Sequence, residues 1–518
     1  MTAIPYQLSL FRLEEGISIL FNPESRASCT VSDAGIKSLL TLPNVPGSAG
    51  EITLLISQQK VDHPGPFRSL FQALKVGQCV PILPEEKFAF SPDDVRQIPQ
   101  KVIVYPALAC NLRCRYCWNA WGTYGRSDMP MMSRQTASRT GRWIASLIAS
   151  SDDQDEGVQE IEFFGGEPLL APDAFRIITE LVCETARKQG RKITILLQTN
   201  GLLLTPDLIH FCKEHQVRIS ISLDGPTKNH DAMRITAKQS GSHQQVVEAI
   251  QRGFSIYPEG ISIRATLVPP YDVFGAYDYF HSLRVPDKAV EIARVLPYRF
   301  TRNGQIDYDK SLAWSPSRPY WHRFLVEYLH RLQTQQGVYF IKSVFGTLNS
   351  AVRPIDRRKT APCDFGIVSP AVLPDGTLIP CYFFAFDPSV TLGDITGGIN
   401  PDKTMAVMKQ VPSSVGVSEP CRTCFARYLC GGPCYARSKA RTGSMAGFND
   451  ITCDIDRESF ISNFFTAALW AQKDPQFIQK LKANQGADKE KDKLLLETLF
   501  ARHYLKEPVT AETQAPVD

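Results

Sequence analysis

The chain has 518 residues, of which 43% are hydrophobic and 21% charged, and its formal net charge at pH 7 is +4. This composition indicates a globular protein with a large core and about three domains. The weak net charge, and the lack of a Lys/Arg block interleaved with aromatic residues, argue against a nucleic-acid partner. The first 25 residues lack the apolar core of a signal peptide, and no stretch reaches about 18 apolar residues, so we expect a cytoplasmic protein without a membrane partner.

The 14 cysteines are unevenly distributed, because ten of them fall between Cys110 and Cys117 or between Cys363 and Cys453. In a reducing compartment, clustered cysteines indicate metal ligands rather than disulfides. The isolated cysteines are expected to be small buried hydrophobic residues; they are Cys29, Cys79, Cys183 and Cys212.

Residues 1–98 precede the first cysteine group and are expected to form a small α+β domain. Tyr6–Leu13 and Gly16–Phe21 have strand patterns, and helices are expected over Ala34–Leu42 and Phe67–Val76. Strands followed by short helices resemble the winged-helix peptide-recognition domains of many peptide-modifying enzymes. A cap that merely covers one end of the core is the alternative.

From Lys101 onward strand patterns alternate with helical ones, for example Arg134–Ala149 and Pro172–Gln189, which favours a parallel sheet with right-handed crossovers. The expected strands are Val102–Tyr105, Glu160–Phe164, Ile193–Leu197, Arg218–Leu223, Ile261–Leu267 and Val290–Val295. Six such units over residues 99–300 predict an α/β fold of the partial (β/α)6 TIM-like barrel type. Ligands of such folds bind at the carboxyl ends of the strands.

Cys110, Cys114 and Cys117 follow the first of these strands with C-x3-C-x2-C spacing. Three thiolates from one tight loop can hold three irons of a cubane cluster and leave the fourth iron without a protein ligand. Such an open iron indicates a cluster that does chemistry rather than one that only carries electrons. A zinc knuckle or scattered core cysteines are the alternatives.

Further polar motifs follow the next strands. Gly165-Gly166-Glu167-Pro168 ends the second strand, where two glycines allow a ligand to approach the backbone closely. Asn200 follows the third strand, and Ser222 and Asp224 lie at the end of the fourth. Each motif alone is also compatible with a tight turn whose polar side chains bond only their own backbone.

Taken together, these motifs resemble the radical S-adenosylmethionine (radical SAM) superfamily, with Tyr116 in the aromatic position of its cysteine motif. The resemblance implies that Cys110, Cys114 and Cys117 hold a [4Fe–4S] cluster whose open iron chelates SAM before reductive cleavage to a 5′-deoxyadenosyl radical. It also implies a set of SAM-binding residues, namely Tyr116, Gly165, Gly166, Glu167, Asn200, Ser222, Asp224 and Arg234.

The second cysteine group lies in residues 357–456 and comprises Cys363, Cys381, Cys421, Cys424, Cys430, Cys434 and Cys453. Seven cysteines exceed the four ligands of one structural zinc site, which is the alternative, and approach the eight of two clusters. The pattern resembles the SPASM domain, which implies two auxiliary [4Fe–4S] clusters and three clusters in all.

By that resemblance, the first auxiliary cluster is held by Cys363, Cys381 and Cys434, and the second by Cys421, Cys424, Cys430 and Cys453. Pro354–Pro362 contains no further cysteine, so we expect the first auxiliary cluster to have an open iron or to be of a different type.

The remaining segments carry weaker patterns. Residues 301–356 are expected to form a helical bridge, in which the amphipathic segment Pro319–Gln335 is a candidate wall of the substrate cavity. Residues 457–506 are expected to be C-terminal helices, and residues 507–518 a disordered tail.

The resemblance implies an enzyme that abstracts hydrogen from a ribosomally made precursor peptide and forms an oxidative cross-link, either C–C or thioether. Its partners are the peptide and an electron donor such as a flavodoxin or ferredoxin. The sequence identifies no catalytic acid, base or hydrogen donor.

Three different functions compete with this one: a SPASM dehydrogenase or epimerase, a sulfatase-maturase-like enzyme, and a non-catalytic Fe–S scaffold that binds peptides. An epimerase needs a thiol hydrogen donor, for which Cys183 and Cys212 are nominal candidates. Anaerobic sulfatase maturases carry an Asp directly after the second SPASM cysteine, where this chain has Tyr382, which disfavours a sulfatase maturase. The intact cysteine triplet speaks against the scaffold.

Overall fold

The structure is a computed structural model of the chain. It describes residues 6–12, 18–21, 28–32, 44–46, 51–56, 99–128, 130–150, 157–301, 305–309, 312, 318–336, 339–352, 362–363, 365, 369–387, 389–411, 420–421, 424–483 and 500–505. None of the helices in these ranges is both long enough and apolar enough to cross a membrane.

Six parallel strands form the centre of the molecule, and each one pairs with the next along the chain. They are β6 (Lys101–Ala107), β7 (Glu160–Gly165), β8 (Thr194–Thr199), β9 (Arg218–Ser222), β10 (Ile261–Leu267) and β11 (Val290–Arg294). Sequential parallel pairing through helical crossovers is the arrangement of a (β/α) barrel. The predicted partial (β/α)6 barrel is therefore confirmed, and each predicted strand is found within two residues of its expected ends.

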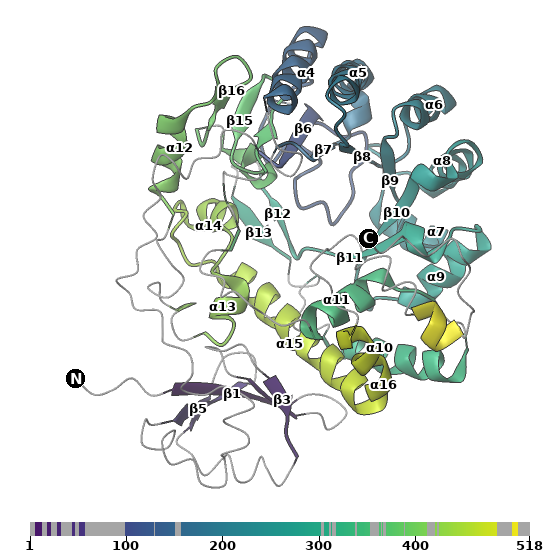
Figure 1. The fold of residues 1–518 in the computed structure, drawn as a ribbon, viewed down its shortest axis with the longest axis vertical. Coiled ribbons are helices and arrows are strands. Elements are labelled where there is room, and N and C mark those ends of the chain that lie inside the picture. The colour runs from purple at the N-terminus through teal and green to yellow at the C-terminus, as the bar shows by residue number, and fades with distance from the viewer. Residues whose placement is uncertain are drawn as a thin grey trace.

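Helices cover the outer face of this sheet and form an arc around it (Figure 1). They are α4 (Arg134–Ala149), α5 (Pro172–Lys188), α6 (Pro206–Glu214), α7 (Thr227–Met233), α8 (His243–Ile256) and α9 (Val273–Ser282). Their apolar faces pack on the strands in one large core, which contains Phe163, Phe175 and Ile219. Local signals fix the helix starts: the Ser133 side chain accepts from the Thr136 amide before α4, and Thr205 caps α6, which begins with Pro206.

The sheet does not end at β6. Strand β14 (Ala371–Val372) pairs with β6 in parallel, and β15 (Thr377–Ile379), β16 (Gly393–Asp394) and β17 (Gly398–Ile399) extend it as antiparallel strands. Cys381 lies just after β15. The region that carries the second cysteine group is thus joined by backbone hydrogen bonds to the strand that leads into the first group.

The chain after β11 adds two hairpin strands and several helices. These are β12 (Tyr298–Phe300), β13 (Ile306–Tyr308), α10 (Arg318–Thr334), α11 (Lys342–Val352), α12 (Pro401–Met408), α13 (Arg427–Cys430), α14 (Tyr435–Thr442), α15 (Asp450–Lys473) and α16 (Pro475–Ala483). The predicted bridging helix is present as α10, but it packs through Tyr328 onto Trp470 of α15 and does not wall the cavity described below.

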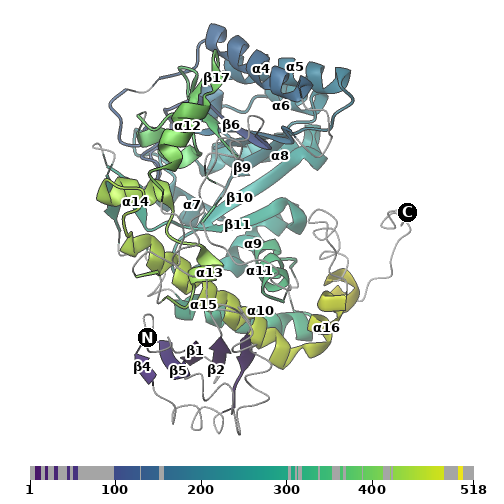
Figure 2. The same ribbon diagram turned by 60° about the vertical axis from the view of Figure 1, so that its left-hand side comes forward.

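The N-terminal region contains an antiparallel sheet with strand order β3-β2-β1-β5-β4. Its strands are β1 (Tyr6–Arg12), β2 (Ser18–Phe21), β3 (Ser28–Thr30), β4 (Asn44–Pro46) and β5 (Glu51–Ile56). The two helices expected over residues 34–42 and 67–76 lie outside the described residues, so peptide recognition by this region stays a prediction. The sheet lies beneath α13 and α15 in both views (Figures 1 and 2).

Aromatic contacts attach this sheet to the second cysteine region. The Phe11 ring lies edge-on to Phe425, with centroids 4.8 Å apart, and contacts Phe464 of α15 at 6.0 Å. Phe425 lies between Cys424 and Cys430 in the chain. The N-terminal sheet therefore supports the segment that carries these cysteines.

We expect Phe11→Ala to detach the N-terminal sheet, because deletion of a buried Phe side chain costs about 3–5 kcal/mol and Phe11 is only 1% exposed. Limited proteolysis should then cleave the segment before residue 99 faster than in the wild type. Phe448→Ala, at a side chain that is 38% exposed, is the control and should leave the rate unchanged. Equal cleavage rates in all three proteins would contradict this packing.

Candidate functional site

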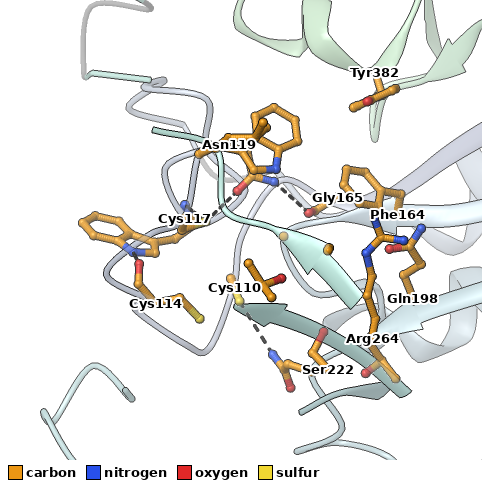
Figure 3. A pocket seen from close by; sticks show the side chains of 18 of the residues that line it. Cys110, Cys114, Cys117, Asn119, Phe164, Gly165, Gln198, Ser222, Arg264 and Tyr382 are labelled. Atoms are coloured by element: carbon orange, nitrogen blue, oxygen red, sulfur yellow. Dashed lines mark hydrogen bonds between the residues drawn. The ribbon is translucent and has the colours of Figure 1, made fainter. Parts of the chain in front are cut away.

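A cavity of about 650 Å³ opens at the carboxyl ends of strands β6 to β11. Cys110, Cys114 and Cys117 line one side of it, Gln198 and Arg264 line another, and Tyr382 reaches in from the second cysteine region (Figure 3). The volume is in the range of sites for small molecules and cofactors. The structure thus brings together residues from four distant parts of the chain.

The three cysteines of the first group are free thiols on the loop after β6. Backbone amides point at two of them, from Leu112 to Cys110 Sγ at 3.4 Å and from Trp121 to Cys117 Sγ at 3.1 Å. Burial raises the pKa of Cys117 to about 12 and the pKa of Cys110 still further, so both thiols are neutral unless a cation is present. Buried thiols that receive amide hydrogen bonds suit soft metal ions such as iron.

Gly166, directly after β7, and Gly122, in the cysteine loop, allow these two segments to approach closely. A Cβ atom at Gly166 would lie 2.0 Å from the carbonyl oxygen of Ala109, and one at Gly122 would lie 2.4 Å from Gly166 Cα. The Glu167 amide donates to that Ala109 oxygen at 2.8 Å. The glycine turn therefore fixes the residue directly before Cys110, in addition to lining the cavity with Gly165 and Gly166.

The predicted SAM ligand Glu167 is placed differently. Its side chain is fully buried and is not among the lining residues. Its carboxylate accepts hydrogen bonds from Thr199 Oγ1 and the Asn200 amide, both at 2.8 Å, and from the Leu169 amide at 3.1 Å. Burial raises its pKa to about 7 despite these bonds. In this structure Glu167 joins the glycine turn to the end of β8, and a direct contact with SAM stays a prediction.

Asp224, Arg234 and Tyr116 form one buried network. Arg234 binds both carboxylate oxygens of Asp224, at 2.8 and 3.1 Å, and the Tyr116 hydroxyl donates to Asp224 at 2.5 Å. Asp224 itself does not line the cavity, whereas Tyr116 and Arg234 do. Since the bidentate pair already uses two donors of the guanidinium, Arg234 has only its remaining N–H groups for a ligand.

Asn200 and Ser222, the other predicted SAM-binding residues, line the cavity. Asn200 Nδ2 donates to Asn111 Oδ1 at 2.7 Å and lies 3.7 Å from Cys110 Sγ. The end of β8 is thereby tied to the cysteine loop.

His230 is a supporting residue that lies outside the predicted SAM-binding set. It is fully buried, and its Nδ1 accepts from the Asp224 amide at 3.3 Å, so Nε2 carries the proton and donates to Ser242 Oγ at 3.0 Å. Burial, with the charge of Arg234, lowers its pKa to about 3. The neutral ring holds the turn that presents Asp224.

The second cysteine group separates into a set of four and a set of three. Four cysteines line one small cavity, together with Arg427 and Arg457; they are Cys421, Cys424, Cys430 and Cys453. The other set is Cys363, Cys381 and Cys434. Burial raises the pKa of the Cys381 thiol, and the nearby Cys434 and Cys363 raise it further.

No three His, Cys, Asp or Glu side chains in the described ranges converge tightly enough to bind a single metal ion. A cubane makes a different demand, because each thiolate ligates a different iron and the sulfur atoms stay farther apart. All-sulfur donor sets of three, three and four cysteines fit Fe–S clusters better than one ion.

An aromatic wall separates the first cysteine group from Cys381. We define it as Trp118, Phe164, Tyr382 and Phe383, all of which line the cavity. The Trp118 and Phe383 rings have centroids 4.6 Å apart, and Phe383 and Tyr382 are 4.3 Å apart. Trp118 directly follows Cys117, and Tyr382 directly follows Cys381. The position directly after a clustered cysteine was therefore the sequence signal that could have identified these two wall residues.

Comparison with known families matches residues 104–272 to the model described as the radical SAM superfamily. This range begins in β6 and includes the cysteine triplet and the glycine turn. Residues 104–272 form a radical SAM domain. Such a domain implies SAM and a [4Fe–4S] cluster as cofactors, and it makes the chain a radical SAM enzyme.

Known relatives of this radical SAM enzyme include sulfatase-maturating enzymes. It is 25% identical to a cysteine-type anaerobic sulfatase-maturating enzyme of Clostridium perfringens, over 65% of this chain and 89% of the relative. It is 32% identical to a serine-type one of Bacteroides thetaiotaomicron, over 29% of this chain and 36% of the relative. A solved structure described as native anSMEcpe with bound AdoMet has a TM-score of 0.56 at 21% identity, and the match covers 75% of this chain and 100% of that one, so the fold is shared.

We expect Gly166→Ala to disturb the cysteine loop, because the new Cβ meets backbone atoms that have little room to move. Overpacking of this kind costs about 1–3 kcal/mol, and the reconstituted protein should bind less iron. Gly397→Ala is the matched control, since a Cβ there meets nothing within 4 Å. Equal iron content and equal melting temperatures in both variants would contradict the close approach.

We expect His230 to stay neutral between about pH 5 and 8, because its folded pKa is about 3. A histidine with a lowered folded pKa stabilises the fold above its unfolded pKa near 6.5. That stability is lost as pH falls toward the folded value, by up to about 1.4 kcal/mol per pH unit. Nitrogen NMR of labelled histidine should show one ring that keeps its Nε2–H form; titration of every histidine near pH 6.5 would contradict the assignment.

Proposed function

We propose that this radical SAM enzyme modifies a peptide or protein substrate and forms an oxidative cross-link between side chains, either C–C or thioether. The observation that carries the proposal is the single cavity that extends from the cysteine triplet to the residues after Cys381. A substrate in this cavity would contact the SAM-binding side and the first auxiliary site at once. The relatives whose names describe maturation of sulfatases, which are proteins, support a polypeptide substrate.

The donor set indicates which residues would hold each cofactor. Cys110, Cys114 and Cys117 would ligate the cluster that binds SAM, and Gly165, Gly166, Asn200 and Ser222 line the space beside it. When bound, this pair of cofactors supplies a 5′-deoxyadenosyl radical that abstracts a hydrogen atom from the substrate. The protein positions the substrate and excludes water, for which the aromatic wall is suited.

We further propose two auxiliary [4Fe–4S] clusters in the second cysteine region. Cys421, Cys424, Cys430 and Cys453 would hold one, beside Arg427 and Arg457, whose charges favour thiolate ligands. Cys363, Cys381 and Cys434 would hold the other, with one iron open. A substrate radical that closes a new bond must lose an electron and a proton, and a cluster held by these cysteines would be placed to accept the electron.

The lining residues favour a cross-link over formylglycine formation. Tyr382 follows Cys381, where sulfatase maturases carry Asp. Burial raises the pKa of its hydroxyl above its usual value, so the hydroxyl stays protonated near neutral pH and is not available to take up a proton. Among the described lining residues the one carboxylate is Glu162, which already binds Lys101 at 2.5 Å and accepts from Gln198.

The positions of two isolated cysteines disfavour an epimerase. Cys183 and Cys212 lie on the outer helices α5 and α6 and do not line the cavity. Neither thiol is therefore placed as the hydrogen donor that epimerisation needs.

A cross-linking enzyme requires a precursor peptide and a source of electrons, and we propose that a flavodoxin or ferredoxin supplies those electrons.

The decisive experiment is anaerobic incubation of the reconstituted enzyme with SAM, a strong reductant and candidate precursor peptides co-expressed with it. We expect 5′-deoxyadenosine together with a peptide that has lost the mass of two hydrogen atoms. Cys114→Ala should abolish both products, whereas the control Cys183→Ala should retain them. No 5′-deoxyadenosine from the wild type would favour a scaffold, and an unchanged peptide mass with altered stereochemistry would favour epimerisation.

A further inference from the structure

Four cationic side chains line the cavity, and three of them are paired by carboxylates of the chain. Lys101 binds Glu162, with its Nζ also 2.7 Å from Glu160, and Arg234 binds Asp224. Arg264 binds Glu291 at 2.9 Å. The fourth is Arg437, which has no ion pair with any described residue.

Arg437 lies on α14, three residues after Cys434, at the second cysteine side of the cavity. Its guanidinium carbon lies 4.6 Å from the centroid of the Phe383 ring and 5.2 Å from that of Tyr298. Its Nε is buried without a hydrogen-bond partner. Asp456 is near enough to act on it through space but does not form a salt bridge with it.

This arrangement leaves Arg437 as a cation at the cavity wall without a salt bridge to a described residue. An arginine is always protonated in proteins, and a buried charge without a partner is costly. The two aromatic faces restrict the guanidinium plane and satisfy its charge in part, while its Nε has no hydrogen-bond partner. A carboxylate is the group that matches this planar set of donors in a bidentate manner.

We propose that Arg437 binds a carboxylate of the substrate peptide, supplied by an Asp or Glu side chain or by the C-terminus, and so positions the reacting residue against Phe383. This inference rests on the proposed function, because it assumes a peptide in the cavity. It adds a substrate class, which is peptides with an acidic group beside the modified residue. It also makes Arg437 a residue that determines specificity.

The same geometry offers Arg437 a second partner, the thiolate of Cys434 and the cluster it would carry. In that case the guanidinium would change the reduction potential of the auxiliary cluster and would not select peptides. The two roles give different results in one set of variants.

The test is selection from a random peptide library by the anaerobically reconstituted holoenzyme with SAM. One library has free C-termini and a second has amidated C-termini, so that a side-chain carboxylate and a terminal one are distinguished. The variants are Arg437→Gln and Arg437→Lys. The control is Arg441→Gln, on the same helix. The Arg441 side chain is 43% exposed, and its Nε lies 3.7 Å from Asp450 Oδ1, so this arginine is paired and does not line the cavity.

We expect the wild type and Arg441→Gln to enrich acidic peptides, or free C-termini, and Arg437→Gln to bind them at least about tenfold more weakly. Arg437→Lys should retain part of the preference, since it keeps the charge without the planar donors. Equal enrichment in Arg437→Gln, or peptides retained by the wild type without any acidic preference, would overturn the inference alone. A shifted auxiliary-cluster potential in Arg437→Gln with unchanged peptide preference would do the same and assign the residue to the cluster. No retained peptide in any protein would overturn the proposed function as well.

Discussion

The site depends on one steric constraint, the contact of the glycine turn after β7 with the backbone just before the first cysteine. Gly166 has room for no Cβ against Ala109, and the Glu167 amide bonds the Ala109 carbonyl. The buried Glu167 carboxylate accepts hydrogen bonds from Thr199 and Asn200 and so links the glycine turn to the end of β8. The ends of β6, β7 and β8 are thereby held at fixed spacing. The loop after β6 can then hold its three thiols in place for a cluster without further support.

A second constraint joins the two cysteine regions. Because β14 extends the barrel sheet through β6, the chain after β15 returns to the mouth of the barrel and brings Cys381 and the following aromatic residues to the cavity. The cavity therefore has a wall from each half of the molecule. This shared wall gives the oxidative step of the proposed function its physical basis, since a substrate radical would form beside an electron acceptor.

Much of this architecture was predictable from local sequence. Alternating apolar strands and amphipathic helices gave the barrel, and β10 has the expected ends, Ile261 and Leu267. Contacts between distant residues were not predictable. Arg234 forms a salt bridge with Asp224, so its charge is already paired within the chain. Glu167 accepts a hydrogen bond from the Asn200 amide and does not line the cavity. The strand Glu51–Ile56 was also missed, because its partner β1 lies about forty residues earlier and no short turn signals the pairing.

The proposed chemistry requires that one iron of the cluster on Cys110, Cys114 and Cys117 is open and binds SAM directly. Electron–nuclear double resonance of the reduced protein with SAM carrying a ¹⁵N label in its methionyl amino group measures this contact. We expect a hyperfine coupling between the label and the cluster, which is absent in Cys110→Ala. A wild-type spectrum with a reduced cluster and bound SAM but no coupling to the label would contradict direct binding.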